Sequence, residues 1–294
     1  MNSFAALLLT IVAIAAQAQD VAARPQVVAL MAAVGDRIEL VRQKRETGSH
    51  FEPYERQVLQ MANQALNDAV LRGLDAAVAE DQPQVQRVLL RWTMPAELAD
   101  RVEKSLGKDR QDLVLDAVTH YLSLLSERQN WDRIELVVPA YKFSPIKGMG
   151  TRLSGIGVYI QPLQAQHVNF GLGQNGVTLT DVDGDFTTVN PNTGETGNSS
   201  VYVATYMYFE RLTYNAKTLE LIKRQRFFSN TKYADPQSVE VDVAKQMSPD
   251  QLVDKLAETV ERAAYRSIRP ATSEVRVSPV KPLPAASAAS PSGS

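Results

Sequence analysis

The sequence predicts a mixed α/β or α+β fold with a strand-and-helix part at the N-terminus, a meander of antiparallel strands and a C-terminal helix. Three observations predict it. Short apolar runs alternate with amphipathic helical stretches before Trp131, β-branched and aromatic residues with Gly and Asn turns dominate after it, and a capped helical stripe ends before Pro270. We therefore expect a mixed sheet.

The first half of the chain supplies the alternating part. "PQVVALMAAVGDRIELVRQKRE" holds two apolar runs around Gly35-Asp36, which predicts a hairpin or a strand and its continuation. Residues 53–80 predict a helix, "QVQRVLLRW" predicts a strand, and Pro95 and residues 109–126 predict further helix. The stripe of the first helix consists of Val58, Ala62, Leu66, Ala69, Leu74 and Ala77.

The second half reads as strands followed by one helix. The strand-like segments are "DRIELVVPAYKF", "YIQPL", "NFGLGQNGVTLTDVDGDFTTV", "VYVATYMYFERL" and "TLELIKRQRFF", with tight-turn dipeptides such as Asn175-Gly176. Ser248 is a good N-cap with Pro249 behind it, so the last helix is expected to run from there to Arg269.

Both ends of the chain have a distinct composition. The apolar run of "MNSFAALLLTIVAIAAQAQD" ends in a small-x-small pattern, which predicts a signal peptide over residues 1–18. Such a run spans roughly 20 Å as a helix, short of a bilayer core of ~30 Å, so no stable membrane span is expected after cleavage. Residues 270–294 are rich in Pro, Ala and Ser and predict a disordered tail, which leaves residues 19–269 as a single globular domain.

The composition narrows the function classes. The formal net charge is −2 and the cations are scattered, so the positive field that nucleic-acid binders use is missing. The chain has no cysteine, which excludes disulfides, thiolate metal sites and a cysteine nucleophile. An exported, cysteine-free globular protein is best placed in a bacterial periplasm.

The glycine-rich stretch "SPIKGMGTRLSGIGVYIQP" could cradle a phosphate or let the chain turn. A dinucleotide fingerprint from Gly148 would need glycine where Leu153 stands, and a P-loop from Gly150 would need a lysine that is absent. Both motifs also require a helix next, whereas β-forming residues follow. The stretch therefore predicts a strand–loop–strand connection whose cations, Lys147 and Arg152, could meet an anionic ligand.

Two further constellations point to chemistry without completing a motif. Asp181, Asp183 and Asp185 alternate as in some calcium loops, but the glycine and glutamate of an EF-hand are not at their positions, so a Gly-turned hairpin with a polar edge explains them equally. A hydrolase related to SGNH esterases, with altered residues around Asp36, Ser49 and His50, is the alternative function, although Arg37 occupies the position of the serine nucleophile.

The long hairpin offers a second binding surface. A turn at Asn215-Ala216 would set Arg211 opposite Glu220 and Phe209 opposite Ile222. The other face would then carry tyrosines beside two polar side chains, a surface that could bind a glycan, a peptide or a partner, or be covered by the protein's own helix or loop. The residues of this face are Tyr202, Tyr206, Tyr208, Lys223 and Gln225.

Four segments, "GDRIELV", "NQALNDAVLRGLDAAV", "WDRIELVVPAYKF" and "GMGTRLSGIGVYIQP", resemble uncharacterised exported proteins of Gram-negative bacteria. The resemblance implies an envelope location and carries over no functional residue. We therefore expect a non-enzymatic binding or assembly module of the envelope, whose partner is an envelope protein or a small ligand, with no cofactor, no metal and no catalytic residue assigned. The candidate binding residues are Lys147, Arg152, Tyr206, Tyr208 and Lys223.

Overall fold

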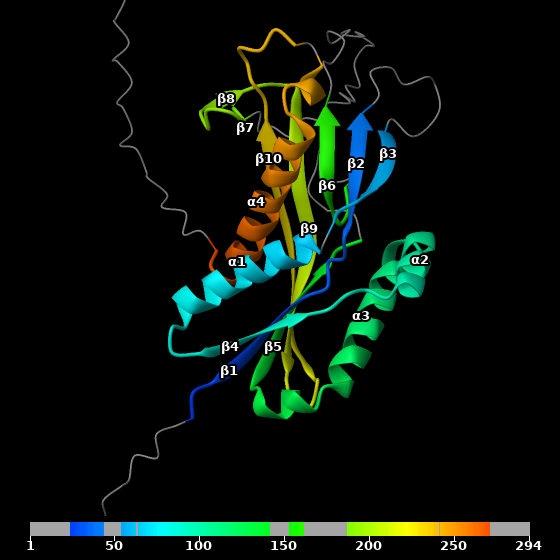
Figure 1. Ribbon diagram of the computed structural model, residues 1–294, viewed down its shortest axis with the longest axis vertical. Coiled ribbons are helices and arrows are strands. Elements are labelled where there is room, and N and C mark those ends of the chain that lie inside the picture. Colours follow the sequence, from blue (N-terminus) through cyan, green and yellow to red (C-terminus); the bar gives the residue numbers. More distant parts are fainter. Residues whose placement is uncertain are drawn as a thin grey trace, which may run out of the picture.

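The computed structural model describes residues 24–43, 54–62, 64–141, 153–161, 187–240 and 242–270. Within these ranges, strands β1 to β10 join in one mixed sheet, and helices α1 to α4 pack against it (Figure 1). The mixed α/β class, with antiparallel strands followed by a C-terminal helix, is therefore confirmed. The predicted signal peptide and the predicted tail after Pro270 lie outside the described residues.

The strands are β1 (Val27–Ala32), β2 (Arg37–Gln43), β3 (Tyr54–Gln60), β4 (Gln86–Arg91), β5 (Arg133–Pro139), β6 (Ile156–Gln161), β7 (Thr187–Val189), β8 (Thr196–Asn198), β9 (Tyr202–Asn215) and β10 (Leu221–Tyr233). The helices are α1 (Ala65–Asp81), α2 (Ala96–Lys104), α3 (Gly107–Leu124) and α4 (Pro249–Ile268).

The 14-residue strand β9 organises the sheet. One edge of β9 pairs along its length with β10, while the other edge pairs first with β6 and then with β5, both antiparallel. Strands β5 and β6 therefore lie end to end along β9. Strands β1 and β2 repeat this arrangement one position further out, because β1 pairs parallel with β5 and β2 pairs parallel with β6. The two interruptions between successive strands, one between β1 and β2 and one between β5 and β6, consequently lie side by side. We call them the two strand interruptions.

The helices cover the two faces unequally. Apolar side chains of α1 and α4 pack with those of β1 and β9 on one face, and α2 and α3 cover the other face of β1, β5 and the end of β9 (Figure 1). Helices α1 and α4 approach closely at Gly73, where an added Cβ would lie 2.2 Å from the Glu261 carbonyl oxygen. That contact explains why glycine stands inside α1.

Several sequence predictions are confirmed. The runs around Gly35-Asp36 form a strand and its continuation rather than a hairpin, and the predicted strands and helices from residue 86 to residue 139 are present. The last helix starts as expected, because the Ser248 side chain accepts a hydrogen bond from the Gln251 backbone N–H and the Gln251 side-chain oxygen accepts one from the Ser248 backbone N–H.

The expected helix over residues 53–80 is wrong in its first part. Residues Tyr54–Gln60 form β3, which pairs antiparallel with β2 along its whole length, and the helix begins only at Ala65. Val58 belongs to this strand and not to the helical stripe. The spacing of Val58 fitted a helix. The backbone of this segment instead forms hydrogen bonds with the edge of β2, and local sequence propensity takes no account of such a partner.

The predicted register of the β9–β10 hairpin is also wrong. The connection is longer than a two-residue turn, because the Asn215 carboxamide oxygen accepts hydrogen bonds from the backbone N–H groups of Lys217 and Thr218. Arg211 is therefore opposite Gln225, and Phe209 is opposite Phe227. The shift moves the residues of β10 to new partners, with direct consequences for the proposed tyrosine surface.

Candidate functional site

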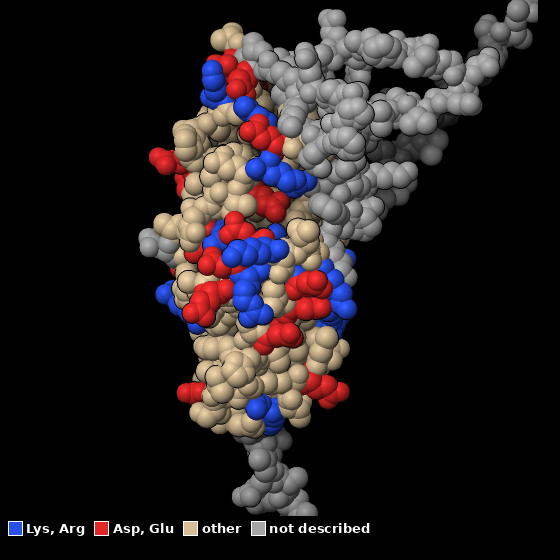
Figure 2. Space-filling model, turned by 90° about the vertical axis from the view of Figure 1, so that its right-hand side faces the viewer, with Lys and Arg blue, Asp and Glu red and all other residues tan. Residues whose placement is uncertain are grey.

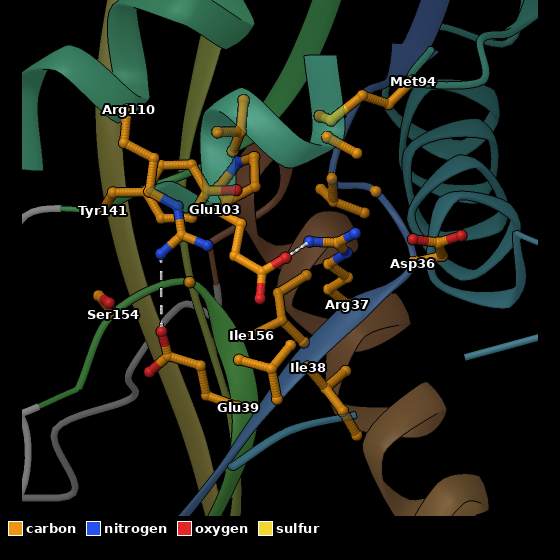
Figure 3. Close-up of a pocket in the computed structure, with 17 residues that line it drawn as sticks. Asp36, Arg37, Ile38, Glu39, Met94, Glu103, Arg110, Tyr141, Ser154 and Ile156 are labelled. Carbon is orange, nitrogen blue, oxygen red and sulfur yellow. Dashed lines mark hydrogen bonds and ion pairs between the residues drawn. The ribbon is translucent and has the colours of Figure 1, made fainter. Parts of the chain in front are cut away.

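The clearest cavity in the described part of the molecule lies at the carboxyl ends of three neighbouring strands. Strands β4, β1 and β5 are parallel, and the residues that follow each of them, including Met94, Gly35 and Tyr141, line one pocket beneath α2 and α3 (Figure 3). Open α/β sheets bind their ligands at this edge, because the loops after parallel strands diverge there. The depression measures about 570 Å³ with its open part included, and the centre of a water-sized sphere can occupy about 40 Å³ of it.

Glycines allow the backbone to turn at the two strand interruptions beside this pocket. Gly35, between β1 and β2, has φ +76°, and Gly155, just before β6, has φ +66°. Both values lie in the left-handed region that glycine adopts without strain. Around Gly155 the backbone bonds continue, since its N–H donates to the Ala140 carbonyl and its carbonyl accepts from the Tyr208 N–H. The sheet is therefore interrupted at the pocket without losing its hydrogen bonding.

The carboxylate of Glu39 and the guanidinium groups of Arg56 and Arg110 meet at one wall of the pocket, which we call its inner wall. Glu39 of β2 is 3.4 Å from the Arg56 Nη1 and 3.8 Å from the Arg110 Nη1, and its side chain is 21% exposed. Both distances exceed those of a strong charge-assisted hydrogen bond, which is about 2.7–2.9 Å. Figure 3 shows Arg110 of α3 reaching toward Glu39 from the opposite side of the pocket. The carboxylate is thus largely buried but only loosely paired.

Arg110 is held in place by an aromatic ring. Its guanidinium lies 4.1 Å from the centroid of the Tyr141 ring, a cation–π arrangement, and its Nε has no hydrogen-bond partner among the described residues. The neighbouring residue, Gln111, accepts a hydrogen bond from the Tyr141 backbone N–H at 3.2 Å, while its Nε2 has no such partner. Two buried N–H donors are therefore left unused beside the pocket.

The protonation behaviour of the inner wall follows from this loose pairing. Burial raises the pKa of Glu39 above its ordinary value of 4.5, and the nearby charges of Arg56 and Arg110 only partly oppose it. Burial also raises the pKa of Tyr141 and holds that of Tyr206 well above 10.0, with the Glu39 charge contributing in the same direction. Both tyrosines are neutral at physiological pH, so their hydroxyl groups can serve as hydrogen-bond donors.

Helix α2 closes the pocket through few contacts. Val102 is its only buried residue, and its ion pairs run from Asp100 and Glu103 to Arg37 at the start of β2. Surface ion pairs of this kind contribute about 0–1 kcal/mol each. Helix α2 is therefore held over the pocket by one buried side chain and by ion pairs that contribute little.

A second, more polar depression adjoins the first. Gly35, Asp36, Arg37, Met94 and Ala99 line both, so the two form one cleft on either side of the break between β1 and β2. Polar side chains complete the second part, and they are Gln60, Gln64, Asn67, Thr93 and Asp100. The cleft as a whole has an apolar inner part and a polar outer part.

The predicted tyrosine surface is not solvent-accessible. Tyr206 and Tyr208 are 0% and 1% exposed and belong to a buried cluster with other tyrosines of β3, β6 and β9. Tyr208 packs against Phe228 and not against Lys223, because Lys223 pairs with Thr213 and points to the opposite face of the sheet. The structure thus separates Lys223 from the two tyrosines with which it was grouped.

Tyr206 nevertheless lies close to Glu39, although it does not line the pocket. It pairs with Gly157, and a Cβ on Gly157 would lie 2.7 Å from the Tyr206 hydroxyl oxygen and 2.0 Å from the Glu39 carbonyl oxygen. The Tyr206 side chain therefore lies over Gly157, toward β2, and its hydroxyl has no hydrogen-bond partner among the described residues. Glu39, Arg110 and Tyr141 were missed from the sequence, because they come from segments about 30 to 100 residues apart.

Other candidate residues lie outside the described ranges. These are Lys147, Arg152, the three aspartates Asp181, Asp183 and Asp185, and the Ser49-His50 pair. Of the hydrolase residues only Asp36 is described, and its carboxylate accepts a hydrogen bond from Gln60 at 2.8 Å. In the described part of the chain, no group of three or more His, Cys, Asp or Glu side chains is placed to hold a metal ion.

The surface around the cleft carries mixed charges. Figure 2 shows basic and acidic side chains interspersed on the side that bears α2 and α3, which gives this side no field of a single sign. None of the helices in the described ranges combines the length and apolar character needed to cross a membrane.

Comparisons with known proteins add little to this picture. No family model matches the chain, and no curated protein matches it. Among solved structures, a Xanthomonas campestris protein described as DUF330 aligns over 83% of this chain and 81% of its own, with 9% identity and a TM-score of 0.33. A likeness at this level establishes neither a shared fold nor a function, so the function has to be argued from the cleft itself.

Proposed function

We propose that the protein is an exported, non-enzymatic binding module of the bacterial envelope, and that it holds a small molecule in the cleft at the carboxyl ends of β4, β1 and β5. One observation carries the proposal. Glu39 lines this cleft, its side chain is 21% exposed, and its contacts with Arg56 and Arg110 are 3.4 and 3.8 Å long. A buried carboxylate that its own protein pairs this loosely, in a concave site, supports the binding of another molecule there.

The lining residues favour binding over catalysis. Those that the structure describes include no histidine and no cysteine, the residues that most often act as base or nucleophile in hydrolases. Ion pairs and an aromatic ring instead hold the charged groups in place, which suits a preorganised recognition site. A small molecule fits better than a protein partner, because the cleft is concave and its inner part is narrow.

Binding can be tested by following backbone amide NMR signals while fragment-sized compounds are added. Signals of Gly35, Asp36 and Gly155 should move, because these residues line the cleft. Ala99→Trp should abolish the shifts by filling both parts of the cleft. Glu97→Trp is the matched control, since it places the same side chain on an exposed position of α2 that lines neither part. Shifts confined to other surfaces, or unchanged binding by Ala99→Trp, would overturn the proposal.

Export is tested separately. The chain expressed in a Gram-negative host should be recovered from the periplasmic fraction with Gln19 as its first residue by mass spectrometry, which is the product of cleavage after Ala18. Recovery of an uncleaved chain from the cytoplasm would contradict the envelope assignment and leave the binding proposal intact.

A further inference from the structure

Strand β10 leaves most of one edge without a strand partner in the described part of the sheet. Its other edge pairs with β9 along its length, whereas on the outer edge only Tyr233 pairs with a described strand, at Val189 of β7 (Figure 1). Alternate residues of a strand turn their backbone N–H and C=O groups toward each edge. From Lys223 to Thr231, the outer edge therefore presents a row of donors and acceptors that no described strand uses.

The half of β10 that follows the hairpin turn is also accessible. Ile222 is 63% exposed, and the side chains of Arg224 and Arg226 are 42% and 34% exposed. Helix α4 hydrogen-bonds β10 nearer its other end, where Arg262 donates to the Thr231 hydroxyl oxygen. A further strand could therefore reach the edge beside the two arginines.

This accessible half of β10 is positively charged. Its three cations are Lys223, Arg224 and Arg226. Strand β10 contains no acidic residue, and Glu210 of β9 balances only one of the three charges. In the turn before β10, the charges of Lys217 and Glu220 cancel. Two positive charges are therefore in excess at this edge, so it attracts a partner of opposite charge.

The two arginines keep donors for such a partner. Arg224 donates from Nε and Nη2 to one oxygen of Glu210, and Arg226 donates from the same two atoms to the other oxygen. A guanidinium carries more N–H donors than these. Because the two arginines are two residues apart on a strand, they point to the same face of the sheet. Residues opposite them on an added strand would share that face as well.

The charge at this edge excludes two occupants that the protein itself could supply. A second copy does not fit, because pairing two β10 edges would bring their cations together. The residues after Pro270 do not fit either, since they contain Arg276 and Lys281 but only one acidic residue, Glu274. A separate, acidic partner meets neither objection.

We propose that the outer edge of β10 binds an extended acidic segment of a partner protein. The segment adds to the sheet as a further strand, and two of its carboxylates, at alternate positions, pair with Arg224 and Arg226. Backbone hydrogen bonds hold the segment, and the two carboxylates select it. No described residue of β10 lines either part of the cleft, so this surface is separate from the proposed small-molecule site.

A designed peptide tests the charge preference. The probe is a heptapeptide, blocked at both ends, in which two glutamates alternate with three valines between terminal threonines. It should bind the full chain about tenfold more tightly than the same peptide with glutamine in place of glutamate, because hydrogen bonds between charged groups are the stronger ones. Affinities are measured by calorimetry. Amide hydrogen exchange should slow at alternate residues of β10 between Lys223 and Asn230.

Two methylated probes distinguish strand addition from simple charge attraction. One carries N-methyl groups on its valines and the other carries them on its glutamates, so both keep the charge of the parent peptide. Because alternate N–H groups of a strand face its neighbour, one of the two should lose binding and the other should keep it. Equal affinities for the two would overturn the proposed mode of binding.

A substitution in β10 tests the contact itself. Arg224→Gln should weaken the glutamate peptide about tenfold and leave the glutamine peptide unchanged, while Arg226 continues to pair with Glu210. Arg72→Gln is the matched control, because Arg72 is also an exposed arginine paired with a glutamate, Glu261, but lies on α1. An equal loss in both variants would contradict the role of Arg224. If Arg224→Gln does not fold, the peptide comparisons in the unaltered chain still decide the proposal.

Other results would assign the edge differently or reject it. Glutamine peptide binding as tight as glutamate peptide binding would remove the acidic preference, and a failure of every probe would reject the surface. Binding that appears only after Asp181, Asp183 and Asp185 are all replaced by asparagine would give the edge to the chain's own acidic residues. In each case the signals of Gly35 and Gly155 should stay unmoved, so the proposed function of the cleft is judged separately.

Discussion

Two carboxylates of the same sheet, Glu210 and Glu39, each face two arginines, yet they are paired very differently. Glu210 of β9 accepts four hydrogen bonds of 2.5 to 3.1 Å from Arg224 and Arg226, and its side chain is 3% exposed. Glu39 has contacts of 3.4 and 3.8 Å and a raised pKa. A buried carboxylate whose acceptor sites are filled by its own arginines leaves none for another molecule, whereas a buried and loosely paired one is a candidate binding site.

The local architecture accounts for this difference. Glu210 and its two arginines lie on adjacent antiparallel strands, where cross-strand neighbours on one face meet directly. Glu39 lies beside the two strand interruptions, and Arg110 approaches it from α3 across the pocket. Arg224 and Arg226 are therefore positioned by the sheet itself. Arg110, the second arginine near Glu39, is positioned by α3, which belongs to a separate layer.

The largest expected effect belongs to β6, the strand that pairs with β2 at Glu39. Gly157→Ala should destabilise the protein by about 3 kcal/mol, because the new methyl group would collide with the Glu39 carbonyl oxygen and the Tyr206 hydroxyl. Urea unfolding measures the loss. Gly155→Ala serves as the control, since its methyl group would meet only the Tyr141 ring at 3.7 Å, and should cost about 1 kcal/mol through its positive φ. Equal losses for the two variants would contradict the close packing at Gly157.

The next effect tests the fully paired carboxylate. Glu210→Gln should lower the unfolding free energy by about 2 kcal/mol, less than for a wholly buried pair because Arg224 and Arg226 can be rehydrated. Cleft binding should not change, since Glu210 lines none of the described pockets. A loss of ligand binding without a loss of stability would reverse the roles assigned to the two carboxylates.

A smaller, pH-dependent effect is expected at Glu39. Because its folded-state pKa is raised, Glu39 contributes stability that is present below pH 4.5 and is lost as the pH rises through the folded-state pKa. Glu39→Gln lacks this titration, so its stability relative to the wild type should increase from acid toward neutral pH, by less than about 1 kcal/mol because the site is partly screened by solvent. Parallel unfolding titrations over this range measure the difference, and an opposite slope would mean that Glu39 is well paired.

The smallest effect concerns the hydroxyl behind the pocket. Tyr206→Phe removes a buried hydroxyl that has no partner among the described residues, so stability should stay equal or rise by up to about 1 kcal/mol. Thermal unfolding measures this change. A marked destabilisation would show that the hydroxyl is hydrogen-bonded in solution.

Much of the secondary structure was predictable from local patterns. The apolar runs of β1 and β5, the Ser248 cap of α4 and the glycines before β2 and β6 are local features, and the structure uses them locally. Strand β3 and the hairpin register were not predictable in this way. The partner of β3 is the edge of β2, and the register depends on the turn that Asn215 organises.

The sequence by itself determined the alternation of strands and helices, the capped last helix and the left-handed positions that need glycine, because residues close in the chain set those features. Only the tertiary structure decided the site. Glu39, Arg110 and Tyr141 meet because β2, α3 and the end of β5 converge at two adjacent breaks in one sheet. Which carboxylate is fully paired and which is not depends on distances across these elements, and no spacing along the chain encodes them.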